Sequence, residues 1–116
     1  MAGIGGNIIG TLQVQETKKN RIGEPERIWS DAVQIEGWLG LQSGDSKYSS
    51  YNAKIEESTH VFLCDYNSRT YALSNQDIRM LIKGRIYDVM LIDNPDEMNE
   101  QLEIYLKMVG GNNAGG

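Results

Sequence analysis

The sequence predicts an all-β fold, a small antiparallel β-barrel of about six strands with one long inter-strand loop or short helix. Apolar and polar residues alternate with a period of two over most of the chain, which is the pattern of half-buried strands. No helical pattern alternates with these strands, so a parallel sheet with crossover helices is not indicated. The chain has 116 residues, 40% of them hydrophobic, which suffices for one core but not for two domains.

Both ends of the chain are rich in glycine, "MAGIGGNIIG" at the start and "GGNNAGG" at the finish. Glycine loses the most backbone entropy on ordering, and these ends offer little apolar surface to offset that loss. We therefore expect a flexible N-terminal segment over residues 1–10, a barrel domain over residues 11–109, and a flexible tail over residues 110–116.

The first hairpin begins with a strand at residues 11–15, in which Leu12 and Val14 share one face. The charged stretch 16–27 contains a glycine and a proline, and this composition predicts a long hairpin loop. Its basic part, "KKNR", lies at the end of the hairpin. A second strand is expected to begin at residues 27–29.

The clearest alternation in the chain follows over residues 33–42. The apolar face of this predicted strand consists of Val33, Ile35, Leu39 and Leu41. Gly37 and Gly40 lie inside the strand and suggest a bulge or a sharp bend.

Residues 43–58 break the alternation with a polar, serine-rich stretch. Tyr48, Tyr51 and Ile55 could line one side of a short helix, with Ser43 or Asp45 near its cap. A long polar and aromatic segment inside a small β domain is often functional.

The remaining strands are predicted at residues 59–66, 78–82, 85–92 and 102–108. A polar loop is expected at residues 67–77, and Lys83–Gly84 is expected to form a two-residue hairpin turn.

The predicted strand 85–92 is apolar on both faces. Strict alternation places Ile86, Met90 and Ile92 on one face and Tyr87, Val89 and Leu91 on the other. One face can fill the core of the barrel, and the other needs a second cover. We predict that Tyr87, Val89 and Leu91 form a subunit interface.

The acidic stretch "DNPDEMNEQLE", residues 93–103, holds five carboxylates and no base. Its Asn-Pro lies between two strands and predicts a solvated turn. Paired catalytic acids need a concave apolar site, which a turn tip lacks, and the regular oxygen spacing of a calcium loop is absent. The other interpretation that we retain is an acidic docking surface.

No other residues suggest catalysis. His60 and Cys64 lie roughly 13 Å apart along one predicted strand, which excludes a nucleophile–base pair. We interpret His60 as a packing residue and Cys64 as a small buried one. Trp29 and Trp38 are interpreted as core or interface anchors. We expect no cofactor, no metal and no enzymatic activity.

Composition excludes further classes of protein. A net charge of −5 and a pI near 4.8 argue against non-specific binding to duplex DNA. The single cysteine excludes an intrachain disulfide and fits a reducing compartment. We expect no membrane span and no signal peptide.

The order of these elements resembles the head closure family of long-tailed bacteriophages, also described as head-tail connector or stopper proteins. The resemblance runs through "GWLGLQSGDSKY" and "ESTHVFLCDY" and covers roughly residues 11–109. It is strongest over residues 78–107, where "GRIYDV", "NPDEMN" and "LEIYLK" follow the family pattern of hairpin, acidic turn and final strand. None of these motifs is catalytic.

The resemblance implies a structural protein of the virion, made in the host cytoplasm. Such proteins form a ring, expected to be a dodecamer, between the portal and adaptor proteins of the head and the tail terminator or tail tube protein. Packaged double-stranded DNA passes through the channel without sequence-specific binding. An acidic chain suits such a pore, since like charge prevents adhesion.

By position, the resemblance also implies a segment that helps to close the channel. Its residues are Ser43, Gly44, Asp45, Ser46, Lys47, Tyr48, Ser49, Ser50, Tyr51, Asn52, Ala53, Lys54, Ile55, Glu56 and Glu57. We further predict docking contacts with adjoining rings from two charged sites at opposite ring faces. These sites consist of Lys18, Lys19 and Arg21 at the basic tip, and Asp96 and Glu97 in the acidic turn.

Three alternatives stay open at this point. The chain could be a neighbouring morphogenesis protein such as a tail terminator or an adaptor. It could be a monomeric β-barrel binding module, although the acidic charge disfavours nucleic acid as its ligand. An enzyme is the third class, for which the sequence offers no group of catalytic residues.

Overall fold

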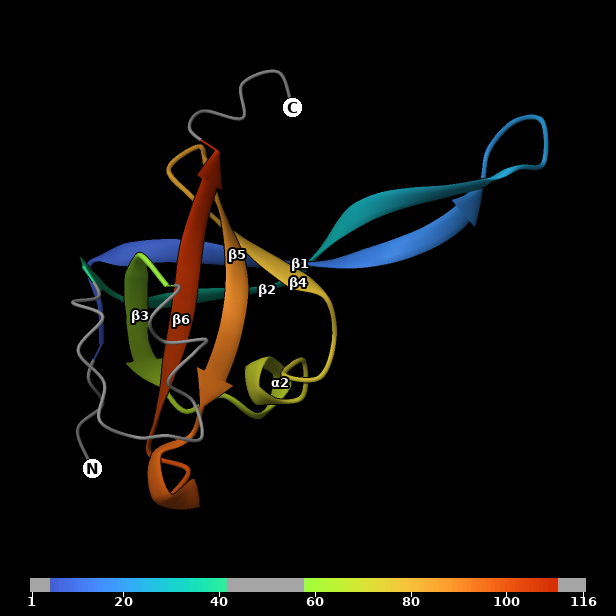
Figure 1. Cartoon of the computed structure of the whole chain (residues 1–116). Coiled ribbons are helices and arrows are strands. Elements are labelled where there is room, and N and C mark those ends of the chain that lie inside the picture. The colour runs from blue at the N-terminus through green and yellow to red at the C-terminus, as the bar shows by residue number, and fades with distance from the viewer. Residues whose placement is uncertain (1–4, 42–57, 111–116) are drawn as a thin grey trace.

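A computed structural model describes residues 5–41 and 58–110 of the chain (Figure 1). The strands are β1 (Ile8–Lys19), β2 (Pro25–Leu41), β3 (His60–Asp65), β4 (Ile78–Ile82), β5 (Arg85–Asp93) and β6 (Gln101–Gly110). They pair antiparallel in the order β1-β2-β3-β6-β5-β4 and close into a barrel through the pairing of β4 with β1. The predicted all-β barrel of six strands is therefore confirmed.

Alternation along the strands places one side chain in two inside the barrel. In β4 the pattern is regular, with Ile78, Met80 and Ile82 buried and the residues between them only half-buried. The other buried apolar residues come from the other five strands: Leu12, Ile35, Phe62, Cys64, Tyr87, Ile92, Leu102, Ile104 and Leu106. These side chains form one continuous core.

The hairpin between β4 and β5 has the predicted two-residue turn. Ile82 pairs with Arg85, so only Lys83 and Gly84 connect the strands. Both residues have positive φ, 50° and 79°, which matches the type I′ turn that fits the twist of a hairpin.

Among residues 58–110, two short helices lie in the stretches predicted as loops. Helix α2 (Ser68–Tyr71) forms a single turn in the stretch predicted as a polar loop. The side chain of Asn67 caps it by accepting a hydrogen bond from the Thr70 amide. The 3₁₀ turn η2 (Pro95–Glu97) lies between β5 and β6, where the Asn-Pro turn was predicted.

The predicted loop at residues 16–27 is wrong in most of its length. β1 continues to Lys19 and β2 begins at Pro25, and the two strands stay paired up to the Lys19–Pro25 pair. The turn itself comprises only residues 20–24. In Figure 1 this part of the hairpin projects away from the barrel. We call residues 15–29, the paired strands with their turn, the hairpin arm.

The irregularities of the sheet lie away from the glycines that suggested them. The β1–β2 pairing has a register shift between Leu12 and Gln13. The β5–β6 pairing has register shifts between Ile86 and Tyr87 and between Val89 and Leu91. Gly37 is needed instead for close approach. A Cβ atom at this position would overlap the Leu63 carbonyl oxygen and the Phe62 ring.

Candidate functional site

The predicted interface on β5 requires a correction. Met90 is skipped in the β5–β6 register, because Val89 pairs with Leu106 and Leu91 pairs with Tyr105. This bulge reverses the alternation, so Tyr87 and Val89 point to the core together with Ile92. Tyr87 is only 1% exposed and packs edge-on against His60, so it cannot serve as a contact for a neighbouring subunit. Of the three predicted interface residues, Leu91 is the one left on the outer wall, half-buried.

The predicted channel segment, residues 43–57, lies outside the described residues. The role of this segment therefore stays a prediction that rests on the resemblance.

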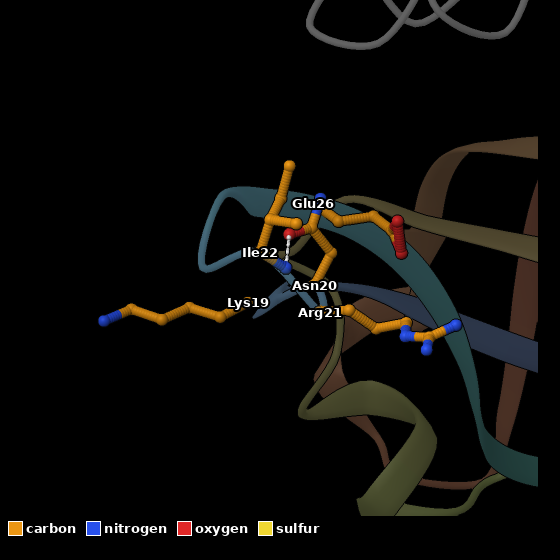
Figure 2. Close-up of a pocket in the computed structure, with 5 residues that line it drawn as sticks. All are labelled: Lys19, Asn20, Arg21, Ile22 and Glu26. Carbon is orange, nitrogen blue, oxygen red and sulfur yellow. Dashed lines mark hydrogen bonds between the residues drawn. The ribbon is translucent and has the colours of Figure 1, made fainter.

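The predicted basic docking residues lie at the exposed end of the hairpin arm. Lys18, Lys19 and Arg21 are all exposed. The turn is held by Asn20, whose Oδ1 atom accepts hydrogen bonds from the amides of Ile22 and Glu24, both at 3.0 Å. Figure 2 shows the Asn20–Ile22 bond, with the Lys19 and Arg21 side chains extending away from each other.

The end of the arm also exposes apolar surface. Ile22 is 78% exposed, although the chain could have turned here with a polar residue. A shallow hollow beside it is lined by Lys19, Asn20, Arg21, Ile22 and Glu26. A single exposed apolar side chain is common on protein surfaces and does not by itself mark a contact surface.

The predicted acidic docking residues lie at the other end of the molecule. Asp96 and Glu97 are exposed in η2, which Figure 1 shows below the barrel and far from the hairpin arm. The turn is closed by two bonds: the Asn94 amide group donates to Asn99 Oδ1 at 2.8 Å, and the Asn99 backbone amide donates to Asn94 Oδ1 at 3.1 Å. Asp96, Glu97 and Asn99 all have positive φ between 52° and 57°. Such strain in non-glycine residues is concentrated at functional sites.

Next to this turn, the outer wall of β5 and β6 carries a pair of like charges. Asp93 pairs directly with Glu103, and Leu91 pairs with Tyr105. The Tyr105 hydroxyl donates a hydrogen bond to Glu103 Oε1 at 2.8 Å. We call Leu91, Asp93, Glu103 and Tyr105 the acidic wall.

Electrostatics within the acidic wall are unfavourable. Burial raises the pKa of Asp93, and the nearby carboxylates of Glu103 and then Asp96 raise it further. Burial, together with the hydrogen bond to Glu103, also raises the pKa of Tyr105. No lysine or arginine of the described residues contributes to either shift. Directly opposed like charges on neighbouring strands destabilise a sheet.

The hairpin arm has two chemically different faces. Paired residues of an antiparallel ribbon share a face, and faces alternate along each strand. Register therefore places Thr17, Lys19 and Arg27 on the face that also carries Gln15 and Trp29. This cationic face holds no carboxylate, whereas the opposite face mixes Glu16, Lys18, Glu26 and Ile28.

A network of side chains fixes the base of the cationic face. The Arg79 guanidinium lies 4.4 Å from the Trp29 ring centroid, a cation–π contact. Arg79 also donates to Gln13 Oε1 at 2.8 Å, and Gln13 donates to Asp31 Oδ1 at 2.7 Å. Trp29 is therefore an anchor of the arm on the outside of the barrel, not a core residue. Trp38 is also outside, 45% exposed on β2.

The remaining candidate residues are structural. Cys64 is 1% exposed, and burial followed by the charge of Asp65 raises its pKa to about 11. His60 packs against Tyr87, and burial with the nearby Arg85 lowers its pKa. Both predicted packing roles are confirmed. Within residues 5–41 and 58–110, no group of three or more His, Cys, Asp or Glu side chains could hold a metal ion. In the same part of the chain no helix is long and apolar enough to cross a membrane.

Two features of the candidate site were not predicted from the sequence. Asp93 and Glu103 lie opposite each other because of the β5–β6 pairing register, which cannot be read from the sequence. The cationic face could have been found, because Thr17, Lys19 and Arg27 follow a period of two on either side of a turn. Interpreting residues 16–27 as a loop hid that pattern.

Comparison with known proteins identifies a family. The family model described as "Phage head completion protein" matches residues 10–108, which includes nearly all of the barrel and the whole hairpin arm. No curated protein matches the chain.

Proposed function

The chain belongs to the phage head completion protein family, and we propose that it forms a ring at the head-tail connector of a long-tailed phage. The family gives it a structural role in the phage head and a place in the virion. The finer proposal is a ring between the portal and adaptor proteins and the tail, which extends the DNA channel and provides the surface on which the tail docks.

The observation that carries this proposal is the family match over residues 10–108, nearly all of the barrel. The shape of the molecule supports it, because the exposed hairpin arm and the acidic turn lie at opposite ends and can reach different neighbours (Figure 1). A contact between unlike surfaces of successive copies generates a ring when the rotation closes.

The ring is tested by imaging particles assembled with this chain. We expect an annular density between the portal vertex and the tail, and its disappearance from particles that lack the chain. A monomer bound elsewhere on the head would contradict the ring.

We further propose that residues 43–57 help to retain packaged DNA in the channel. The resemblance of the chain to head closure proteins and the polar, aromatic composition of this segment support the proposal. Deleting the segment should give heads that carry the ring but lose DNA, measured by nuclease sensitivity of the packaged genome. Heads that keep the ring and retain their genome would exclude the gating role.

The last part of the proposal assigns docking to the two charged ends. Lys18 and Arg21 at the end of the arm, and Asp96 and Glu97 in the acidic turn, contact adjoining rings. Replacing both Asp96 and Glu97 with lysine should reduce the joining of heads to tails. The matched control is Glu36→Lys, an exposed reversal on β2. Equal joining in both variants would exclude this docking surface.

A further inference from the structure

The hairpin arm is a structure without a core of its own. β1 pairs with β4 only over residues 11–14, and β2 pairs with β3 only over residues 38–41. Beyond the Gln15–Trp29 pair, the arm is a ribbon of two strands with nothing paired to either edge among the described residues. A two-stranded ribbon is marginally stable in water unless it packs on another surface. Such a ribbon is suited to lie on a partner.

The chemistry of the arm limits what that partner is. Residues 18–27 carry four bases and two acids, in a chain whose net charge is −5. Both acids of this stretch lie off the cationic face, because Glu26 is on the opposite face and Glu24 is in the turn. The cationic face therefore presents Lys19 and Arg27 without a local counter-charge, and it fits an acidic surface.

The same chain carries such a surface. The acidic wall holds Asp93 and Glu103 directly opposite each other, with Leu91 and Tyr105 as half-buried apolar surface beside them. Residues 93–103 carry five carboxylates and no base, so this part of the chain is strongly acidic. A cation placed over Asp93 and Glu103 would relieve the repulsion that the isolated chain leaves uncompensated.

The arm of a chain cannot reach its own acidic wall. In Figure 1 the arm projects from one side of the barrel, whereas the acidic end of β5 and the start of β6 lie at the bottom, beside η2. The arm is also held in its direction at the base by the contact of Arg79 with Trp29. The complementary surfaces can meet only between two molecules.

We propose that the cationic face of the hairpin arm docks on the acidic wall of the next copy of the chain, with Lys19 and Arg27 over Asp93 and Glu103. This inference rests on the proposed ring and specifies how successive subunits bind. The contact joins unlike surfaces, so each copy offers one arm and one wall and the chain of contacts runs in one direction. Charge sets the register of the contact, and Leu91 and Tyr105 supply its apolar area.

Cross-linking in assembled particles tests the contact directly. Cys64 is buried, so new cysteines react selectively. Particles carrying the double variant Arg27→Cys with Glu103→Cys are treated with a short bismaleimide and separated on a denaturing gel. We expect a ladder of linked subunits from the double variant and only monomers from each single variant. Lys18→Cys with Glu103→Cys is the matched control, because Lys18 lies on the opposite face of the arm, and it should link far less.

Charge exchange provides a second measurement that does not depend on cross-linking. Arg27→Glu should lower incorporation of the chain into particles by about tenfold or more, as expected when an attractive contact becomes repulsive. Adding Glu103→Arg to the same chain should restore incorporation. Lys83→Glu, a reversal of the same charge at an exposed position in the β4–β5 turn, should leave incorporation near the native level. Thermal unfolding of each variant separates a lost contact from a damaged barrel.

The outcomes distinguish this inference from the proposed ring. A ring that is visible in particles while the double cysteine variant gives no ladder overturns the arm contact and leaves the ring intact. Dimers from the Arg27→Cys variant alone would indicate a two-fold contact and also overturn it. Loss of contacts between the arm and packaged DNA in Arg27→Glu particles, with unchanged incorporation, would make DNA the partner instead. Absence of any ring removes the proposed function and this inference together.

Discussion

The close approach at Gly37 gives a prediction that can be worked out from the structure. Gly37 lies on the core side of β2, is buried, and pairs with Ile8 of β1. A Cβ atom placed there would overlap the backbone oxygen of Leu63 and the ring of Phe62. The Phe62 ring is itself fully buried, so neither obstacle can move aside without displacing β3 or the core.

The expected cost of Gly37→Ala follows from overpacking. Adding a methyl group to a well-packed interior costs about 1–3 kcal/mol, and a backbone obstacle favours the upper part of that range. For a domain of this size, this loss lowers the melting temperature by roughly 5–15 °C. Urea unfolding followed by tryptophan fluorescence measures the same loss as a lower midpoint with an unchanged slope.

Gly40 provides the matched control, three residues further along the same strand. A Cβ atom at Gly40 would meet nothing within 4 Å. Gly40→Ala should therefore change the free energy of unfolding by no more than about 0.5 kcal/mol. If Gly37→Ala unfolds at the same urea concentration as Gly40→Ala, β2 and β3 do not approach closely at Gly37.

Two further predictions concern titratable groups. Burial raises the pKa of Asp93 in the folded chain above the value of 3.8 expected in the unfolded chain, so the folded chain holds the carboxyl proton more tightly. The free energy of unfolding therefore falls as pH rises from about 3.8 through the raised pKa of the folded chain. Asp93→Asn should stabilise the protein at pH 7 by a few tenths to about 1 kcal/mol and give no advantage in acid, and equal stability of the variant and native chain at pH 7 would contradict the repulsion. Burial raises the pKa of Cys64 to about 11, so its thiol should resist a disulfide reagent at pH 8 in the folded chain and react fully in urea. Rapid reaction without urea would mean that β3 opens readily.

The sequence was informative wherever one face of a strand is buried and the pairing is regular. Burial alternates regularly along β4, apolar residues recur at every second position of β6, and both strands were predicted to within a few residues. The β4–β5 turn was predicted because Lys83–Gly84 lies between two apolar runs, and glycine readily adopts the positive φ that a two-residue hairpin turn needs. In these segments local preference and global fold agree.

The faces of β5 could not be predicted because the strand contains a bulge that has no signal in the sequence. Residues 86–92 are apolar at six of seven positions, so the sequence offers no polar side to fix the register. Met90 falls out of register and moves Tyr87 inward and Leu91 outward. The strand itself was predicted correctly, but the extra residue in the bulge changes which side chains face the core, so the interface predicted at Tyr87 is wrong.

The hairpin arm was missed for a different reason. Periodicity reports burial, and neither face of the arm fills the core beyond Val14. Its alternation concerns charge: Lys19 and Arg27 lie on the cationic face, whereas Glu26 lies on the opposite face. A strand that is polar on both faces has the composition of a loop, and only the pairing of β1 with β2 distinguishes them.

The arm and the acidic wall each lower the stability of the isolated chain. The arm orders a ribbon of two strands without a core, and the wall holds Asp93 against Glu103 without a neighbouring cation among the described residues. Each deficit is of the kind that the other surface would correct, since Lys19 and Arg27 supply charge and the wall supplies a surface for the ribbon. Features that cost stability locally persist where function uses them. If the contact forms, charge reversal at Arg27 should weaken assembly without lowering the melting temperature of the free chain, because nothing in the barrel core depends on the arm.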